Sequence, residues 1–142
     1  MKKLSGGKAL AVAAVAGGAV LASVAPVMAE VSAQSPSVSA VRVDAPGKLK
    51  AWGAAVEVPV TYACPQGSSQ PYVYVNLSQN VLGRIASGSG SKQVTCTGGF
   101  ETTKVTVTAQ NLAFWPVDAF AQANLNAYPN TASHEAVIRL SY

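Results

Sequence analysis

Apolar and polar residues alternate with a period of two along much of the chain, and the pattern is clearest in residues 55–64. The positions on one face of that segment are Val56, Val58, Val60, Tyr62 and Cys64. This period predicts a half-buried β-strand that ends in a cysteine. Pro59 lies on the outward face and has no backbone N–H to donate, so we expect a sheet edge or a bulge there.

The same period predicts further strands along the chain. Their ranges are 38–43, 71–79, 92–97, 102–109, 117–127 and 135–142, with shorter pieces at 49–52 and 81–86. In 71–79 the aliphatic side chains form the better core, so we expect Tyr72 and Tyr74 to face outward. The alanine-rich segment 117–127 has a period of two and not 3.6, which favours a strand over a helix. We expect Val117 and Tyr142 to point inward with their strands.

Turn-forming residues separate these strands. Residues 44–47, 65–69 and 128–130 contain proline beside glycine, serine, asparagine or aspartate, and are predicted to be turns or loops. Residues 87–91 read Ser-Gly-Ser-Gly-Ser, which predicts a flexible hairpin loop. Residues 110–116 form a connection, and His134 is placed in a turn at 131–134.

Seven or eight short strands without a helix beyond residue 29 predict an all-β fold. An antiparallel sandwich of two sheets is favoured over a parallel sheet, which would need crossover helices. A closed barrel is the alternative, and the proline-marked edges favour two sheets.

Residues 1–29 have the three parts of a secretory signal peptide. Three lysines precede an Ala/Val/Leu-rich centre, and small residues precede a cut after Ala29. The apolar centre is interrupted by glycine and serine and is shorter than the roughly 20 residues of a membrane span. We therefore expect a secreted, extracellular protein that meets the membrane only during export, with a flexible leader at 30–37 and one domain at 38–142.

The charge balance changes once the signal segment is removed. Residues 30–142 hold seven basic and six acidic side chains, which leaves one net positive charge. Nucleic-acid binding needs a concentrated basic face, so this composition argues against it.

The chain has two cysteines, Cys64 and Cys96. In an exported protein the simplest expectation is one disulfide between them. They do not form a Cys-x-x-Cys motif, so a structural role is favoured over a redox role.

Catalytic and metal-binding patterns are weak. His134 is the single histidine, and no Gly-x-Ser-x-Gly motif accompanies it. With one histidine and both cysteines oxidised, the ligands of a transition-metal site are missing, and we expect no metal or cofactor. Glu57 and Glu101 are the carboxylates that could act as a glycosidase pair, but both are interpreted as solvent-side strand charges. We expect a protein that is not an enzyme.

Several segments taken together resemble a known family. They are Tyr-Ala-Cys-Pro at 62–65, the strand at 73–79, the Gly-Ser-Gly at 88–90 before 94–98, Val-Thr-Val-Thr at 105–108 and Phe-Trp-Pro at 114–116. Over residues 38–142 the chain resembles the small secreted immunoglobulin-like domains of actinobacteria. The resemblance implies an immunoglobulin-like sandwich with one intrachain disulfide and no established activity. The chain departs from antibody domains because its cysteines lie closer together and no tryptophan sits in the usual place between them.

Aromatic side chains provide the functional hypothesis. The candidates for a ligand surface are Trp52, Tyr72, Tyr74, Phe114 and Trp115. Exposed aromatic rings bind sugars and proteins, so a non-enzymatic binding module for an extracellular polysaccharide or protein is the first hypothesis. The alternative for Phe114 and Trp115 is that they cap one end of the core. The alternative functions are an inhibitor of an extracellular hydrolase, using a loop at 83–85, and a small-ligand carrier with a groove between sheets.

Overall fold

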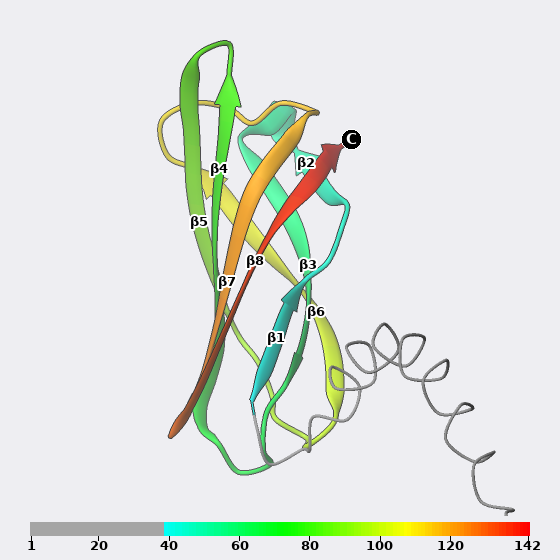
Figure 1. The fold of residues 1–142 in the computed structure, drawn as a ribbon, viewed down its shortest axis with the longest axis vertical. Helices are drawn as coiled ribbons and strands as arrows, with labels where there is room; N and C mark the ends of the chain where they lie inside the picture. The colour runs from blue at the N-terminus through cyan, green and yellow to red at the C-terminus, as the bar shows by residue number, and fades with distance from the viewer. Residues whose placement is uncertain (1–38) are drawn as a thin grey trace, which may run out of the picture. The chain divides into compact units, whose positions relative to one another are not determined.

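The computed structural model describes residues 39–142, so the predicted signal peptide (1–29) and leader (30–37) lie outside the described residues. The described part is all-β, as predicted (Figure 1). Its eight strands are β1 (Ala40–Val43), β2 (Gly47–Lys50), β3 (Ala55–Ala63), β4 (Ser69–Val81), β5 (Arg84–Gln93), β6 (Phe100–Ala109), β7 (Asp118–Tyr128) and β8 (Asn130–Ser141). A single 3₁₀ turn, η1 (Ala51–Gly53), separates β2 from β3. No helix in these residues is long and apolar enough to cross a membrane.

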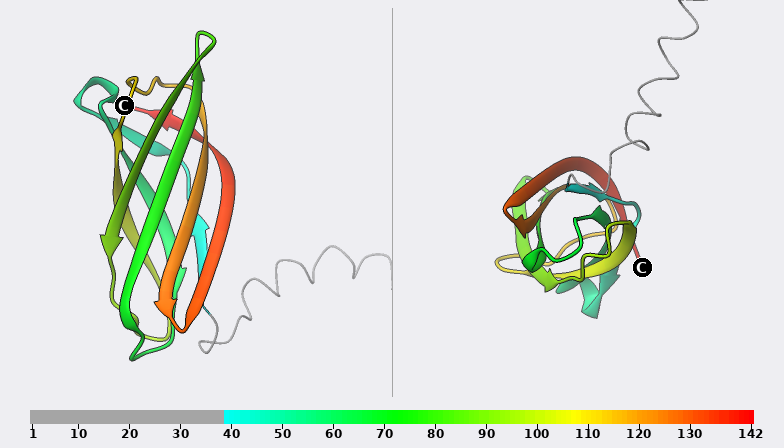
Figure 2. Two further views of the ribbon diagram at one scale, coloured as in Figure 1. Left: turned by 90° about the vertical axis from the view of Figure 1, so that its left-hand side faces the viewer. Right: turned by 90° about the horizontal axis from the view of Figure 1, so that it is seen from below.

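The strands form one sheet that closes on itself. Its order is β1-β3-β2-β8-β7-β4-β5-β6, and β6 pairs back onto β3. Because β1 and β2 pair with different halves of the same edge of β3, they share one strand position, and the closed sheet has seven positions. The view along the strands shows the resulting ring (Figure 2).

Closure of the sheet corrects the prediction of two separate sheets. The ring closes through two narrow seams: β5 pairs with β6 at two positions, and β2 pairs with β8 at two positions. The β2–β8 pair is parallel, whereas every other pairing is antiparallel. The break between β1 and β2 produces this seam, since it turns the chain so that β2 contacts both β3 and β8.

Residues 87–91 are not the predicted hairpin loop. They lie inside β5, and the β4–β5 turn occurs earlier, at Leu82 and Gly83, where both residues have positive φ. The glycines of β5 allow a close approach to β6. A Cβ atom on Gly90 would lie 1.9 Å from the carbonyl oxygen of Thr106, and one on Gly88 would lie 2.4 Å from that of Thr108. The segment is therefore part of a strand, although its composition is typical of a loop.

Strand β3 is central and not an edge, which corrects the expectation for Pro59. It pairs along its whole length with β6, and with β1 and β2 on its other side. The carbonyl oxygen of Pro59 accepts a hydrogen bond from the Asp44 backbone N–H at 2.9 Å. In an antiparallel strand the nitrogen of a residue faces the same neighbour as its carbonyl oxygen. The missing N–H of Pro59 therefore faces the break between β1 and β2, where no ladder bond is lost.

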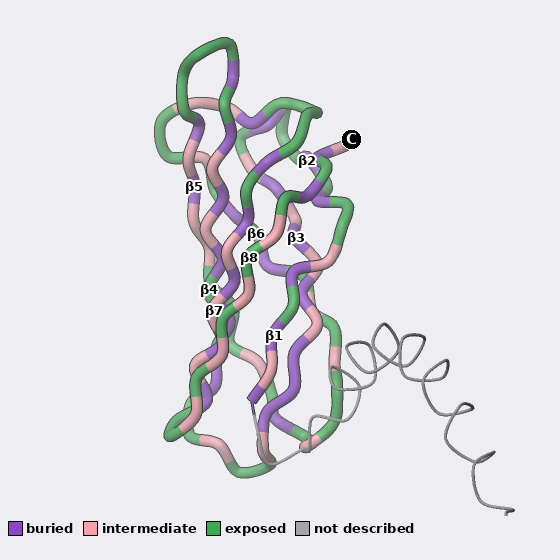
Figure 3. The backbone as a smooth tube through the Cα atoms, in the orientation of Figure 1, coloured by how far each residue is buried: buried purple, intermediate pink, exposed green. Residues whose placement is uncertain are grey.

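The core contains the predicted inward residues of β3, β4, β6 and β7, and burial alternates along these strands (Figure 3). Alanines at every second position of β7 are fully buried, as predicted. Two residues expected inward are exposed: Val117 precedes β7, and Tyr142 follows the end of β8. Both lie outside the strands themselves, although the Val117 carbonyl oxygen still accepts a hydrogen bond from the Leu140 N–H of β8 at 3.2 Å.

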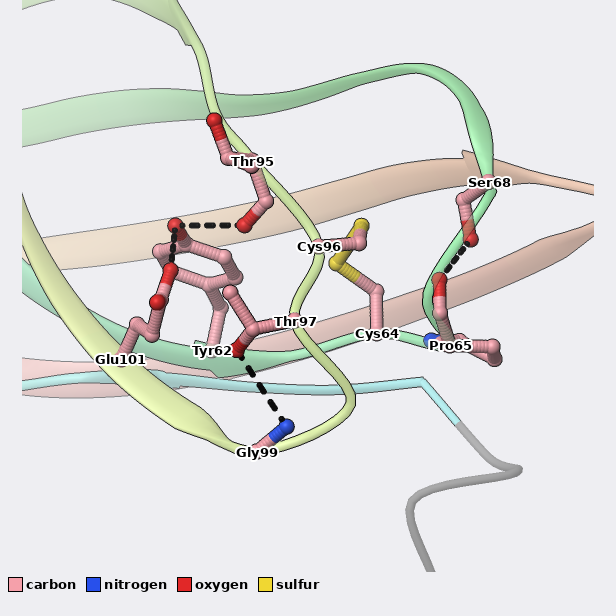
Figure 4. The surroundings of a disulfide bond; sticks show 9 residues. All are labelled: Tyr62, Cys64, Pro65, Ser68, Thr95, Cys96, Thr97, Gly99 and Glu101. Carbon is pink, nitrogen blue, oxygen red and sulfur yellow. Dashed lines mark hydrogen bonds between the residues drawn. A yellow bond between two sulfur atoms is a disulfide. The ribbon is translucent and has the colours of Figure 1, made fainter.

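The predicted disulfide joins Cys64 and Cys96. Cys64 follows β3, but Cys96 lies in the connection between β5 and β6 and not in the predicted strand 92–97 (Figure 4). The bridge therefore ties this connection to the end of β3, and the Gly98 N–H reinforces it by donating to the Cys64 carbonyl oxygen at 3.1 Å.

Next to the bridge, the Tyr62 hydroxyl is 2.8 Å from Glu101 Oε2 and 3.1 Å from the Thr95 carbonyl oxygen, and these two acceptors share its single hydrogen (Figure 4). Burial, together with this carboxylate, raises the pKa of Tyr62 from 10.0 to about 12.

Candidate ligand-binding face

Strand β4 presents its two tyrosines to the outside. Val73, Val75 and Leu77 are buried in the core. Because side chains alternate between the faces of a strand, Tyr72 and Tyr74 must point outward, and they are 41% and 36% exposed. The sequence prediction for both tyrosines is confirmed by this burial pattern.

The register of the sheet places amides and hydroxyls beside these rings. Tyr72 lies opposite Asn126 and Tyr74 opposite Asn124 on β7. Asn126 in turn lies opposite Thr131 on β8, and Asn124 lies opposite Ser133. The three strands lie side by side in Figure 1, so the six side chains form two adjacent rows across one outer face.

These rows enclose an open groove of about 650 Å³, which we call the tyrosine groove. It is lined by Tyr72, Tyr74, Asn124, Asn126, Thr131 and Ser133, together with Leu125 and Ala132. The Asn126 amide donates a hydrogen bond to the Tyr72 hydroxyl oxygen at 3.3 Å, which links the two sides of the β4–β7 pair.

The tyrosine groove carries hydrogen-bonding groups without charge. None of its lining residues is charged. Each asparagine amide offers two donors and an acceptor, and each hydroxyl both donates and accepts. Aromatic rings next to such groups suit a ligand that has apolar C–H faces and many hydroxyls. Anionic ligands, in contrast, are held by arginine or lysine, which this groove lacks.

The other predicted surface aromatics do not join the tyrosine groove. Trp115 is 45% exposed in the β6–β7 connection, and its backbone N–H donates to Gln79 Oε1 on β4. Gln79 is five residues beyond Tyr74, about 17 Å along an extended strand. Its bond to Gln79 therefore places Trp115 toward the opposite end of the sheet from the groove. The β6–β7 connection runs at the end that carries the β4–β5 hairpin (Figure 2).

Phe114 is a core residue and not part of a ligand surface. It is 1% exposed, and its ring lies so close to β5 that a Cβ on Gly88 would be 3.0 Å from Phe114 Cε2. Its backbone N–H donates to the Gly53 carbonyl oxygen at 2.9 Å. Phe114 therefore closes one end of the core, as the alternative interpretation of this residue expected, while its neighbour Trp115 remains half exposed.

Trp52 is the most exposed aromatic side chain, at 89%. It lies in η1, where Ala51, Trp52 and Gly53 all have positive φ (48°, 58° and 87°). The Gly53–Phe114 hydrogen bond places this turn beside the β6–β7 connection. Trp52 and Trp115 thus belong to neighbouring segments at one end of the sheet, away from the tyrosine groove.

The ionisable groups considered for catalysis make structural contacts. His134 lies in β8 and not in a turn, and its Nδ1 accepts a hydrogen bond from the Val43 N–H at 3.2 Å. Glu57 pairs with Lys50 at 3.5 Å, whereas Glu101 accepts the bond from Tyr62. Glu57 and the strand position opposite Glu101 are five residues apart on β3, about 17 Å, which exceeds the separation of about 5–9.5 Å in glycosidases. Residues 39–142 contain no group of three or more metal-ligating side chains.

Four groove residues were missed by sequence reasoning. Asn124 and Asn126 occupy outward positions of the alternating segment, but their partners depend on strand register. The sequence pattern predicts a turn at Thr131 and Ser133 and a strand only from Glu135, whereas β8 begins at Asn130. The one available signal was the outward alternation of polar residues in 117–127.

No protein-family model matches the chain, and no curated protein matches it.

Proposed function

We propose that the protein is an exported, non-enzymatic module that binds an uncharged extracellular polysaccharide in the tyrosine groove. The observation that carries this proposal is the register that places Tyr72 and Tyr74 beside Asn124 and Asn126 in an open, uncharged groove. Sugar rings present C–H faces that pack on aromatic rings, and their hydroxyls pair with amides. An open groove suits a long polymer better than a small enclosed ligand.

Export is supported by two independent features. Residues 1–29 have the signal-peptide pattern, although they lie outside the described residues. The Cys64–Cys96 disulfide fits an oxidising compartment. Mass spectrometry of the protein recovered from the culture medium tests this part, since it should give an N-terminus at Glu30; a protein retained in the cell with Met1 intact would contradict it.

A binding role is favoured over catalysis because His134, Glu57 and Glu101 serve other contacts. The carrier hypothesis gains less support, since the space between the sheet halves is filled by buried valine, leucine and alanine side chains. The inhibitor hypothesis retains one observation: the β4–β5 hairpin carries exposed Leu82, Arg84 and Ile85. Assays against a panel of extracellular proteases and glycosidases test it, and failure to inhibit all of them would remove it.

Pull-down on insoluble polysaccharides tests the main proposal. Cellulose, chitin and xylan serve as probes for wild type, Tyr72→Ala and Tyr74→Ala, with Trp115→Ala as the matched aromatic control. Wild type and Trp115→Ala should be retained on at least one polymer, and the tyrosine variants should be retained about tenfold less. Retention of no protein on any polymer would reject the proposed ligand class. Loss with Trp115→Ala alone would move the site away from the tyrosine groove.

We also propose that the closed sheet is a variant of the immunoglobulin-like fold. Strand order supports this: β8-β7-β4-β5 on one half corresponds to G-F-C-C′, and the β3–β6 pair corresponds to B–E. The first strand position is divided, with β1 on β3 and β2 reaching β8. The disulfide departs from the antibody pattern, because it joins β3 to the β5–β6 connection. NMR contacts between strands test the order, and a β3 that pairs with β4 would overturn it.

A further inference from the structure

A second hollow lies on the same outer face, further along β4. It has a volume of about 290 Å³, and we call it the amide hollow. Its outward lining residues are Asn76, Ser78, Ser87, Gln110, Phe120 and Gln122. None of its lining residues is charged, and Phe120 is 44% exposed.

The two hollows repeat one chemistry along one line. Tyr72 and Tyr74 border the first, and the next outward residues of β4, Asn76 and Ser78, border the second. Asn76 lies opposite Gln122, and Ser78 lies opposite Phe120 on β7. Each hollow thus combines an exposed aromatic ring with amides and hydroxyls. The span from Tyr72 to Ser78 is about 20 Å along the strand.

The amides between the rings are positioned and uncharged. Gln122 Nε2 donates to Glu135 Oε1 at 2.9 Å, which holds that amide in place and leaves its oxygen to accept. Gln110 Nε2 donates to Ser89 Oγ at 2.8 Å at the far border of the hollow. The ring of Phe120 lies about 14 Å from the row of Tyr74, since four residues along β4 and one step between strands separate them.

We propose that the amide hollow is a second subsite for the same polymer, so that one linear, uncharged glycan lies along β4 and β7 and contacts both hollows. This inference rests on the proposed function and adds to it the linear shape of the ligand and the direction of its path. A chain that spans both hollows binds more tightly than one that fills the tyrosine groove alone, because the second contact forms within the same complex.

Affinity measured against oligosaccharide length tests the inference. Calorimetry with di- to octasaccharides of cellulose, chitin and xylan uses the folded wild type, Phe120→Ala and Val137→Ala. Val137 lies opposite Phe120 on β8, is exposed, and borders neither hollow, so it is the matched control. Because Phe120 and Val137 are both exposed, neither variant removes core packing.

For wild type, the affinity should rise with oligomer length until the oligomer reaches about 20 Å. Phe120→Ala should bind long oligomers about tenfold more weakly than wild type does and should bind short oligomers equally well. Val137→Ala should match wild type at every length. An octasaccharide that binds Phe120→Ala as tightly as wild type would overturn the second subsite, and so would an equal loss for short and long oligomers. In both cases the proposed function stands, whereas failure of every oligomer to bind wild type would reject both.

Discussion

Replacement of Gly90 by alanine tests how the sheet closes. The added Cβ would lie 1.9 Å from the carbonyl oxygen of Thr106, whereas ordinary contacts begin at 3.4 Å. The neighbouring atoms belong to the backbone of β6, so no side-chain rotation can relieve the contact. Strands β5 and β6 must therefore separate by about 1.5 Å at this point. The Ser89–Thr108 pair, one of the two that form the β5–β6 seam, lies directly beside it.

The free energy of unfolding should fall by about 3 kcal/mol or more. Overpacking in a well-packed region costs about 1–3 kcal/mol, and each hydrogen bond lost at the seam adds about 0.5–1.5 kcal/mol. For a domain of this size the loss corresponds to a fall in Tm of about 12 °C or more. Differential scanning calorimetry of Gly90→Ala measures it, with urea unfolding as an independent value of the free energy.

Gly99→Ala is the matched control, because it adds the same methyl group in the same part of the chain. The nearest atom to its Cβ is Thr97 Oγ1 at 3.9 Å, an ordinary contact. Its Tm should stay within about 2 °C of wild type. If Gly90→Ala had the same Tm as Gly99→Ala, residues 87–91 would be the loop that their composition predicts. That result would refute the closure of the sheet between β5 and β6.

Three further predictions concern the bridge, Tyr62 and a buried amide. Reduction of the Cys64–Cys96 bond, which spans 32 residues, should lower stability by about 3.7 kcal/mol and Tm by about 15 °C; an unchanged thermogram in reductant would show that the bridge is idle. Because the folded pKa of Tyr62 lies above the unfolded value, its contribution to the free energy of unfolding is complete below pH 10 and is lost as pH rises through about 12. Between pH 9 and pH 11 the free energy of unfolding, measured with urea, should therefore fall more for wild type than for Tyr62→Phe. Equal falls would refute burial and the Glu101 carboxylate as the cause of the raised pKa. Gln79 is buried and bonds both the N–H and the carbonyl of Trp115, so Gln79→Leu should cost about 1–3 kcal/mol in the same assay, whereas a neutral result would mean that water replaces the amide.

Local pattern was sufficient for the faces of the strands. The inward set of β3, the outward tyrosines of β4 and the alanines of β7 follow from alternation, because side-chain direction in an extended backbone is set by neighbouring residues alone. The disulfide was predicted from having two cysteines in a chain whose first 29 residues have the pattern of an export signal. These predictions needed no knowledge of which strands are neighbours.

Pairing between strands was decided by the tertiary structure. The tyrosine groove exists because β4, β7 and β8 pair in one register, and a shift of one residue would exchange the faces. Similarly, Gly90 belongs to a strand because it lies against β6, and Phe114 is buried because the β6–β7 connection meets η1 and β5. Local sequence determines which way a side chain points. The residues that it contacts depend on how segments far apart in the chain pair and bury their apolar faces, and this pairing is fixed only when the sheet closes.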